Sequence, residues 1–348
     1  KSIEGTVNVS STLGTVYNDG QFTVQQNYTY ANKVAGNITY QKNTYGEPST
    51  INSITCSGTW SCAGSNSYYY ALMNSGYIGK IDSEGLTLTG GYNVLYNATG
   101  SANKTYEINR YYTDGATAST EYKKVQTYVK NLEKGSTIGS INGITVTGKG
   151  TKSYYPFNNQ GHIGSVSNVT VNFAEGATAN TSYYVAFLNG DSRYKSYTET
   201  IQTNRTAETD PHLTVSAGIV TKYDRSYVYD TPTIDTIDNL TVNSITLYAM
   251  RNAGHIGTLK NSTITGTQYA MHNSDSGPYT ERQSEQYYSG TSIFATTKGS
   301  SDLSNHYKKN ASSIDLIDNC TITTPANTYA MLNGGHVGTI KNSTLQNR

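Results

Sequence analysis

The chain has 348 residues and a formal net charge of +1; 35% of the residues are hydrophobic, 14% are charged and 32 are tyrosine. This weakly charged, aromatic composition excludes a typical disordered chain and a dedicated nucleic-acid-binding protein, which would carry a basic stripe. The sequence contains no apolar run of about 18 residues, so no membrane-spanning helix is predicted. It also contains no glycine-rich phosphate loop, so nothing indicates a nucleotide cofactor. We therefore expect a soluble, β-rich surface protein without a cofactor.

An internal repeat dominates the sequence. Two looser copies occupy residues 70–81 and 155–166, and the stretch 248–264 recurs almost letter for letter at 329–345. Four copies of one pattern are unlikely to arise by chance and indicate a repeat architecture.

The spacing of the copies indicates the type of repeat. Equivalent isoleucines lie 25 residues apart at Ile138 and Ile163 and 22 apart at Ile234 and Ile256. A unit of about 22 residues that is rich in β-branched side chains and broken by Asn and Gly has the size of one turn of a parallel β-helix. The sequence therefore predicts an all-β solenoid whose turns are stabilised by stacking.

Long excursions follow every second turn. Loops of this length inside a compact protein are normally functional. We expect residues 1–348 to form a single β-helix unit with excursions at 19–50, 98–137, 190–233 and 274–313.

The excursions show the alternation typical of β-hairpins. Examples are 104–112 with 121–130, and 279–288 with 291–297 around a turn at Ser289-Gly290. A hairpin is two strands wide, about 9.6 Å, and two turns of a β-helix rise by the same distance. We therefore predict that successive hairpins form a second sheet beside the solenoid.

Stacking turns about 4.8 Å apart converts each repeated residue into a column. Ile256, Leu259 and Ile264, with their equivalents, are expected in the core. A turn column of amides is predicted to bond to itself or to the backbone: Asn142, Asn168, Asn239, Asn261, Asn319 and Asn342. A neighbouring column alternates in sign, which argues against a catalytic carboxylate cluster: Asp238, Lys260, Asp318 and Lys341.

A histidine column raises the question of a metal site. His162, His255 and His336 share one position, but they belong to alternate turns and lie about 9.6 Å apart, too far for one ion. We predict no metal, and expect these histidines to bond a neighbouring turn's backbone or to cover an edge.

Aromatic residues form a further column, with an apolar column two residues later. Tyr184 lies one place early, so we expect Val185 and Phe187 to fill those positions in its turn. Both columns are interpreted as structural: Tyr70, Tyr155, Tyr248, Tyr269 and Tyr329, followed by Leu72, Phe157, Met250, Met271 and Met331.

Tyrosines in the excursions are the candidate binding residues. They lie near Arg or Lys, and tyrosine combines a rigid ring with a polar tip that suits recognition of carbohydrate or protein. The candidates are Tyr111, Tyr112, Tyr194, Tyr197, Tyr227, Tyr229, Tyr287 and Tyr288.

Two of the three cysteines are interpreted as a pair and the third as a single buried thiol. Cys56 and Cys62 flank a short segment of mostly small residues that would let the sulfurs meet across a tight turn, so a disulfide is predicted, with metal ligation as the alternative. Cys320 occupies a position held elsewhere by Leu240 or Ser262, and we expect a buried thiol.

The motif Asn-x-Gly-x-Ile/Val-Gly-x-Ile/Leu-x-Asn, at 252–261 and 333–342, resembles the passenger domains of bacterial autotransporters, some of them vacuolating-cytotoxin-like. The resemblance implies a right-handed parallel β-helix, export to the Gram-negative cell surface, closely spaced cysteines such as Cys56 and Cys62, and most often adhesion. It also leads us to expect a fragment or processed product.

Together these patterns predict a non-enzymatic cell-surface adhesin that attaches to host cells or other bacteria through a protein or glycan receptor, with self-association possible and no nucleic-acid partner. The alternatives are a β-helical polysaccharide-degrading enzyme, which would need a carboxylate pair, a pore-forming toxin, or a self-assembling scaffold. A remoter alternative is an ice-binding threonine array at Thr241, Thr263, Thr321 and Thr344.

Overall fold

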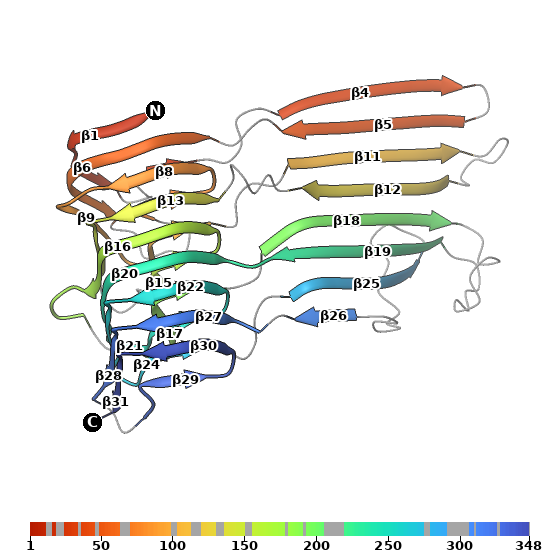
Figure 1. The fold of residues 1–348 in the computed structure, drawn as a ribbon. Helices are drawn as coiled ribbons and strands as arrows, with labels where there is room; N and C mark the ends of the chain where they lie inside the picture. Colours follow the sequence, from red (N-terminus) through yellow and green to blue (C-terminus); the bar gives the residue numbers. More distant parts are fainter. Residues whose placement is uncertain are drawn as a thin grey trace.

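A computed structural model shows the chain as four β-sheets, with no helix among the residues that it describes (Figure 1). Within those residues there is therefore no helix that could cross a membrane. The residues that the structure describes are 1–11, 16–18, 24–33, 36–45, 49–62, 70–98, 103–112, 120–129, 136–149, 155–177, 180–190, 193–204, 219–274, 279–290, 306–309, 311–325 and 328–347.

The largest sheet has 15 strands, all paired in parallel, and the strands between its two ends pair with strands of the repeats before and after them. Most repeats contribute two short strands separated by a corner, or one long strand that covers both positions. The strands are β1 (Ser2–Thr6), β2 (Val9–Ser11), β6 (Thr50–Cys62), β8 (Tyr77–Asp82), β9 (Leu86–Gly90), β13 (Thr137–Asn142), β14 (Thr145–Gly148), β16 (His162–Phe173), β20 (Thr233–Asn243), β22 (His255–Lys260), β23 (Thr263–Thr265), β27 (Ser313–Asp318), β28 (Thr321–Thr324), β30 (His336–Lys341) and β31 (Thr344–Asn347).

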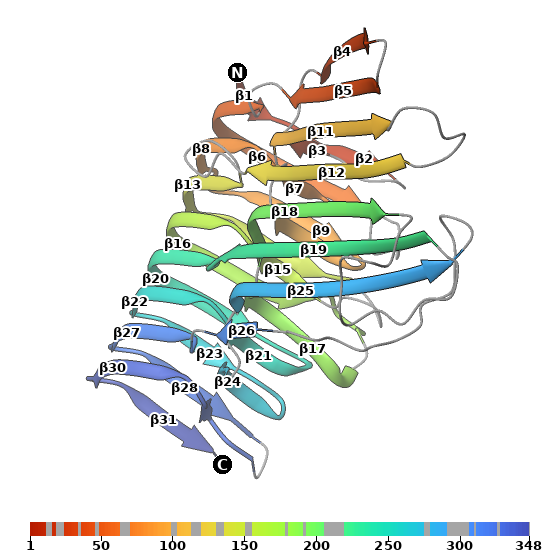
Figure 2. The ribbon, with the colours of Figure 1, turned by 90° about the vertical axis from the view of Figure 1, so that its right-hand side faces the viewer.

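A second parallel sheet has eight strands, one from the segment between each two successive levels of the larger sheet. Its order follows the chain, so both parallel sheets stack the repeats in sequence (Figure 2). The strands are β3 (Val16–Asn18), β7 (Leu72–Asn74), β10 (Asn93–Asn97), β15 (Tyr155–Asn159), β17 (Asn180–Asn189), β21 (Thr246–Asn252), β24 (Tyr269–Asn273) and β29 (Met331–Asn333).

Equivalent residues of successive repeats lie directly beside one another, as the sequence predicted. Ile234 pairs with Ile256, Ile256 with Ile314 and Ile314 with Val337. One threonine column continues without interruption through eight repeats, at Thr59, Thr87, Thr145, Thr170, Thr241, Thr263, Thr321 and Thr344.

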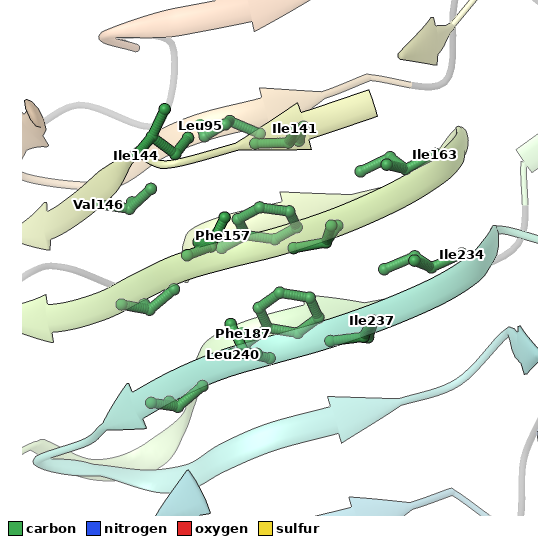
Figure 3. Packing of buried hydrophobic residues seen from close by; sticks show 14 of the residues in the cluster. Leu95, Ile141, Ile144, Val146, Phe157, Ile163, Phe187, Ile234, Ile237 and Leu240 are labelled. Atoms are coloured by element: carbon green, nitrogen blue, oxygen red, sulfur yellow. The ribbon is translucent and has the colours of Figure 1, made fainter. Parts of the chain in front are cut away.

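The hydrophobic core lies between the two parallel sheets. Phe157 and Phe187 of the smaller sheet are fully buried and stack with ring centroids 4.2 Å apart. Figure 3 shows these rings one above the other, and they belong to the same buried cluster as Ile163 and Ile234 of the larger sheet. Val185 pairs with Tyr248 and Phe187 with Met250, which confirms that this repeat is shifted by one residue.

Most repeats carry glycine at one position of the motif, which is held by Asp235 and Asp315 in two others, and close backbone contacts explain several of these glycines. A Cβ atom on Gly139 would lie 2.2 Å from the carbonyl oxygen of Gly79, and one on Gly257 would lie 2.5 Å from the carbonyl of Asp235. These contacts are with the backbone of the adjacent repeat, which cannot move without breaking the parallel pairing. Close approach of the repeats therefore requires glycine at these positions.

The hairpins form a sheet beside the repeats, as predicted because the width of a hairpin matches the rise of two turns. Three excursions contribute six antiparallel strands, and the first forms a separate two-stranded sheet (Figures 1 and 2). The six are β11 (Asn103–Tyr112), β12 (Thr120–Val129), β18 (Arg193–Asn204), β19 (Ile219–Asp230), β25 (Tyr279–Gly290) and β26 (His306–Lys309), and the two are β4 (Val24–Lys33) and β5 (Gly36–Tyr45).

One predicted hairpin turn is wrong. Ser289 and Gly290 continue strand β25, where they pair with Val220 and Ile219, so the chain does not turn there. The partner of β25 on its other side is β26, and the predicted strand at 291–297 lies outside the described residues.

The predicted disulfide between Cys56 and Cys62 is also wrong. The segment between them is not a tight turn but part of β6, where Thr59 and Trp60 pair with β9. Six residue steps along a strand cover up to about 20 Å, whereas a disulfide needs Cα atoms within about 7 Å. Both residues are buried thiols, and so is Cys320, as predicted.

We expect three thiols to react with a chromogenic disulfide reagent when the chain is unfolded without reductant. Burial raises the pKa of the Cys56 and Cys320 thiols, so both should react slowly in the folded chain near neutral pH. Reductant should leave the melting temperature unchanged. A single reactive thiol in the unfolded chain would contradict the structure.

Candidate functional site

The predicted turn column of asparagines is present on the outside of the larger sheet. Asn239 donates to Asn168 over 2.7 Å, and Asn319 donates to Asn261 over 2.8 Å. Asn142 accepts a hydrogen bond from Asn168 Nδ2 over 2.7 Å, as predicted, but it aligns in the strands with Asp82 and Ser167 rather than with the other amides. The remaining members adopt a left-handed backbone, which Asn tolerates better than most residues: Asn168, Asn239, Asn261, Asn319 and Asn342.

The alternating charges next to these amides form ion pairs between repeats. Lys260 Nζ lies 3.1 Å from Asp238 Oδ2, and Lys341 Nζ lies 3.3 Å from Asp318 Oδ2. Hydrogen bonds from Asn261 and Asn342, together with the two lysines, lower the pKa of Asp238 and Asp318 respectively. These carboxylates therefore stay ionised, unlike the raised-pKa acid that general acid catalysis requires.

These two carboxylates should make the fold acid-sensitive. Their folded-state pKa lies below the unfolded value of about 3.9, so the unfolded chain binds more protons and stability falls as the pH falls through this range. We expect the urea midpoint to decline below about pH 4. An Asp238→Asn/Asp318→Asn variant should show a shallower decline, whereas identical pH profiles for the two chains would contradict the ion-pair geometry.

Two histidines of this column, His162 and His255, bind carboxylates of the next repeat rather than its backbone, which corrects the sequence-based expectation. His162 Nε2 lies 3.0 Å from Asp235 Oδ2. His255 Nε2 lies 3.6 Å from Asp315 Oδ2, and its Nδ1 lies 2.8 Å from Ser313 Oγ. Among the described residues no group of three His, Cys, Asp or Glu side chains could hold a metal ion.

A buried ladder of asparagine amides runs along the smaller sheet. Asn252 Nδ2 donates to Asn273 Oδ1 over 2.9 Å and to the carbonyl of Ser313 over 3.0 Å. The sequence showed an Asn at the end of each turn but not this continuous hydrogen bonding. Links of 2.8–2.9 Å join the whole series of Asn74, Asn97, Asn159, Asn189, Asn252, Asn273 and Asn333.

The register of the hairpin sheet brings together tyrosines from separate excursions. Tyr128 pairs with Tyr197, and Tyr197 pairs with Tyr227. Directly paired residues of antiparallel strands occupy the same face of a sheet. The row continues at one end to Lys104 and at the other to Arg282 and then Tyr307. It therefore crosses all six strands, as Lys104, Tyr128, Tyr197, Tyr227, Arg282 and Tyr307.

Alternation along the strands extends this row into a tyrosine face. Residues two positions apart on a strand share a face, and the printed pairings carry that face from β11 to β26. Eleven tyrosines belong to it: Tyr106, Tyr112, Tyr122, Tyr128, Tyr194, Tyr197, Tyr223, Tyr227, Tyr229, Tyr288 and Tyr307.

The eight predicted binding tyrosines do not all join this face. Six do, but Tyr111 and Tyr287 lie on the opposite face, because adjacent residues of a strand alternate. The sequence interpretation missed five members that lie within the same strands. Strand alternation could have suggested them, but the pairing between excursions was needed to bring them together: Tyr106, Tyr122, Tyr128, Tyr223 and Tyr307.

A polar row lies next to the row of Tyr128 on the same face. Gln126 pairs with Glu199, and Glu199 pairs with Arg225. The register therefore places tyrosine, Gln, Glu and Arg at neighbouring positions of one face, and these residue types combine stacking surfaces with hydrogen-bond partners, as is typical of recognition surfaces.

Comparison with known proteins gives no relative: no protein-family model, no curated protein and no solved structure matches the chain.

Proposed function

We propose that the chain is a cell-surface adhesin built on a right-handed parallel β-helix, with the tyrosine face as its contact surface. The parallel stacking of the repeats supports the β-helix. Each repeat pairs its strand in register with the equivalent strand of the next repeat, which is the pattern of that fold. The autotransporter-like motif at 252–261 supports export to the outside of a Gram-negative bacterium.

The observation that carries the proposal is the grouping of tyrosines from three excursions on one face. A structural sheet needs no such grouping, whereas a binding surface uses rigid rings that lose little entropy on binding. The neighbouring row of Gln126, Glu199 and Arg225 favours a surface glycan, whose hydroxyls would bond these groups while its ring faces stack on tyrosine.

The test compares two pairs of substitutions in the hairpin sheet. We expect Tyr197→Ser/Tyr227→Ser to weaken binding to a glycan array and to host or bacterial cells by about tenfold or more, since each buried aromatic contact contributes about 1 kcal/mol or more. Tyr111→Ser/Tyr287→Ser changes the opposite face and is the matched control, which should bind as the unsubstituted chain does.

Circular dichroism and melting temperature show whether each variant folds. Equal binding by the two folded variants, or the absence of binding to any glycan or cell by the unsubstituted chain, would refute the proposed surface. Release of products from a bound polysaccharide would favour the enzyme alternative instead.

A further inference from the structure

The two faces of the hairpin sheet differ in charge. Within the regularly paired part of the sheet, the pairing and the alternation along each strand assign every residue to one face. The tyrosine face holds five basic residues and one acidic residue: Lys104, Arg110, Lys124, Arg225 and Arg282, with Glu199. The opposite face holds five acidic residues and three basic residues: Glu107, Glu121, Asp224, Glu281 and Glu285, with Lys123, Lys222 and Lys308. The tyrosine face is therefore basic, although the whole chain is almost neutral.

Most basic residues of the tyrosine face have no acidic residue at the paired positions that the structure describes. Arg225 is the exception, because it pairs with Glu199. Lys124 pairs with Ile108 and Ile201. The other three pair with tyrosines: Lys104 with Tyr128, Arg110 with Tyr122, and Arg282 with Tyr227 and Tyr307. Four positive charges of this face are therefore not balanced across the strands.

The combination of tyrosine with unbalanced positive charge fits an acidic sugar polymer. A sugar ring stacks its apolar side on an aromatic ring, and a carboxylate or sulfate group forms charge-assisted hydrogen bonds with Lys or Arg. In the row of Tyr128, tyrosines lie between Lys104 and Arg282, which are four strand spacings or about 19 Å apart. A ligand that spans this row would carry anionic groups separated by uncharged surface.

The spacing of the charges argues against a nucleic acid on the same face. The strand spacing and the rise along each strand keep every two of the five basic positions at least about 8 Å apart. The phosphates of one nucleic-acid strand follow each other every 3.4 Å or so, and neutralising them takes a denser basic stripe. An acidic polysaccharide carries at most a few charged groups on each ring, with uncharged ring faces between them.

We propose that the ligand of the tyrosine face is an acidic polysaccharide, whose anionic groups bind Lys104, Lys124, Arg110 and Arg282 while its rings stack on the tyrosines between them. The proposal rests on the proposed function, because it assigns a ligand class to the same surface. The acidic opposite face would repel such a polymer, so the polymer binds one face of the sheet only. Figure 1 shows the hairpin strands to one side of the parallel sheets that hold the hydrophobic core.

The first test measures the binding of the complete chain to polygalacturonate and to heparin by isothermal titration calorimetry at several salt concentrations. Binding should weaken steeply as salt rises, because each ion pair with the polymer displaces bound counterions. Fully methyl-esterified polygalacturonate has the same backbone without the charge, and it should bind about tenfold more weakly or worse.

The second test compares two pairs of substitutions that remove the same charge from opposite faces. Lys104→Gln/Lys124→Gln changes the tyrosine face and should raise the Kd for polygalacturonate about tenfold or more. It should also make the dependence of log Kd on log salt shallower. Lys123→Gln/Lys222→Gln changes the opposite face and is the matched control, which should bind as the unsubstituted chain does. Far-ultraviolet circular dichroism verifies that both variants are folded.

Three results would overturn the acidic ligand. The first is equal, salt-independent binding of the neutral and the charged polygalacturonate. The second is an equal loss of affinity in both folded lysine variants. The third is tighter binding of single-stranded DNA or of anionic lipid vesicles than of either acidic polysaccharide.

Failure of this proposal is distinguishable from failure of the proposed function. If neutral glycans bind, and Tyr197→Ser/Tyr227→Ser abolishes this binding while Lys104→Gln/Lys124→Gln does not, the tyrosine face is still a glycan-binding surface but its ligand is uncharged. If the chain binds no glycan and no cell, both proposals are wrong.

Discussion

Replacing Asn252 with alanine is expected to lower the free energy of unfolding by about 4 kcal/mol. The Asn252 side chain is fully buried and makes four hydrogen bonds: it accepts from Asn189 Nδ2 and from the Gly254 amide, and it donates to Asn273 Oδ1 and to the carbonyl of Ser313. Alanine leaves these buried partners unsatisfied, and each such group costs about 1–3 kcal/mol. Urea denaturation measures the loss.

The outer amide column provides the control. Asn261 also belongs to an amide series, but it is exposed and has a left-handed backbone with φ near 52°. Asn261→Gly keeps that backbone accessible and removes only exposed hydrogen bonds, so a loss of about 1 kcal/mol or less is expected. Equal losses for Asn252→Ala and Asn261→Gly would contradict the buried ladder.

The second large effect is expected for Phe187→Ala, which should cost about 3–5 kcal/mol. Phe187 is fully buried and stacks on Phe157 with an angle of 11° between the ring planes. Its column continues to Met250, so the deletion leaves a cavity between two repeats that the rigid strand pairing prevents from closing. Thermal and urea unfolding should both show the loss.

Two further variants distinguish stacking from general hydrophobicity. Phe187→Leu retains most of the volume and should cost about 1.5 kcal/mol or less. Met331→Ala lies in the same column but in the last repeat, where the side chain is only partly buried, so it should cost clearly less than Phe187→Ala. A loss of stability for Met331→Ala as large as that for Phe187→Ala would contradict the position of Phe187 in an inner repeat and of Met331 in the last one.

The repeat columns could be predicted because one residue type recurs at nearly constant spacing. Ile234, Ile256 and Ile314 each begin a unit at the same point of the motif, so their parallel pairing follows from the spacing alone. The shift of Val185 and Phe187 was likewise readable, because Tyr184 breaks the column by one residue.

The tyrosine face could be predicted only in part. Alternation within one strand distinguishes Tyr111 from Tyr112, but it does not determine which residue of another excursion lies opposite. That register depends on pairing between distant segments, and an irregularity between Tyr194 and Ser196 changes it further. Candidates chosen by proximity to Arg or Lys therefore included residues of both faces.

The cysteine prediction failed because it used local composition only. Small residues around Ser57 and Gly58 are typical of a tight turn, but the pairing of Trp60 with Val9 and Leu88 keeps the segment in a strand. Burial of the Trp60 ring, whose Nε1 donates to the carbonyl of Val7 over 3.1 Å, stabilises this arrangement from outside the segment. Tertiary pairing thus overrides a turn preference.

Distances between spin labels along the threonine column test the in-register stacking of the repeats most directly. With one label at Thr344, a second label at Thr241, Thr145 or Thr59 lies three, five or seven strand spacings away. Parallel stacking predicts backbone separations of about 14, 24 and 34 Å, a linear increase of about 4.8 Å for each repeat. Separations that do not increase linearly with the number of repeats would contradict the stacked architecture, and with it the surface assigned to binding.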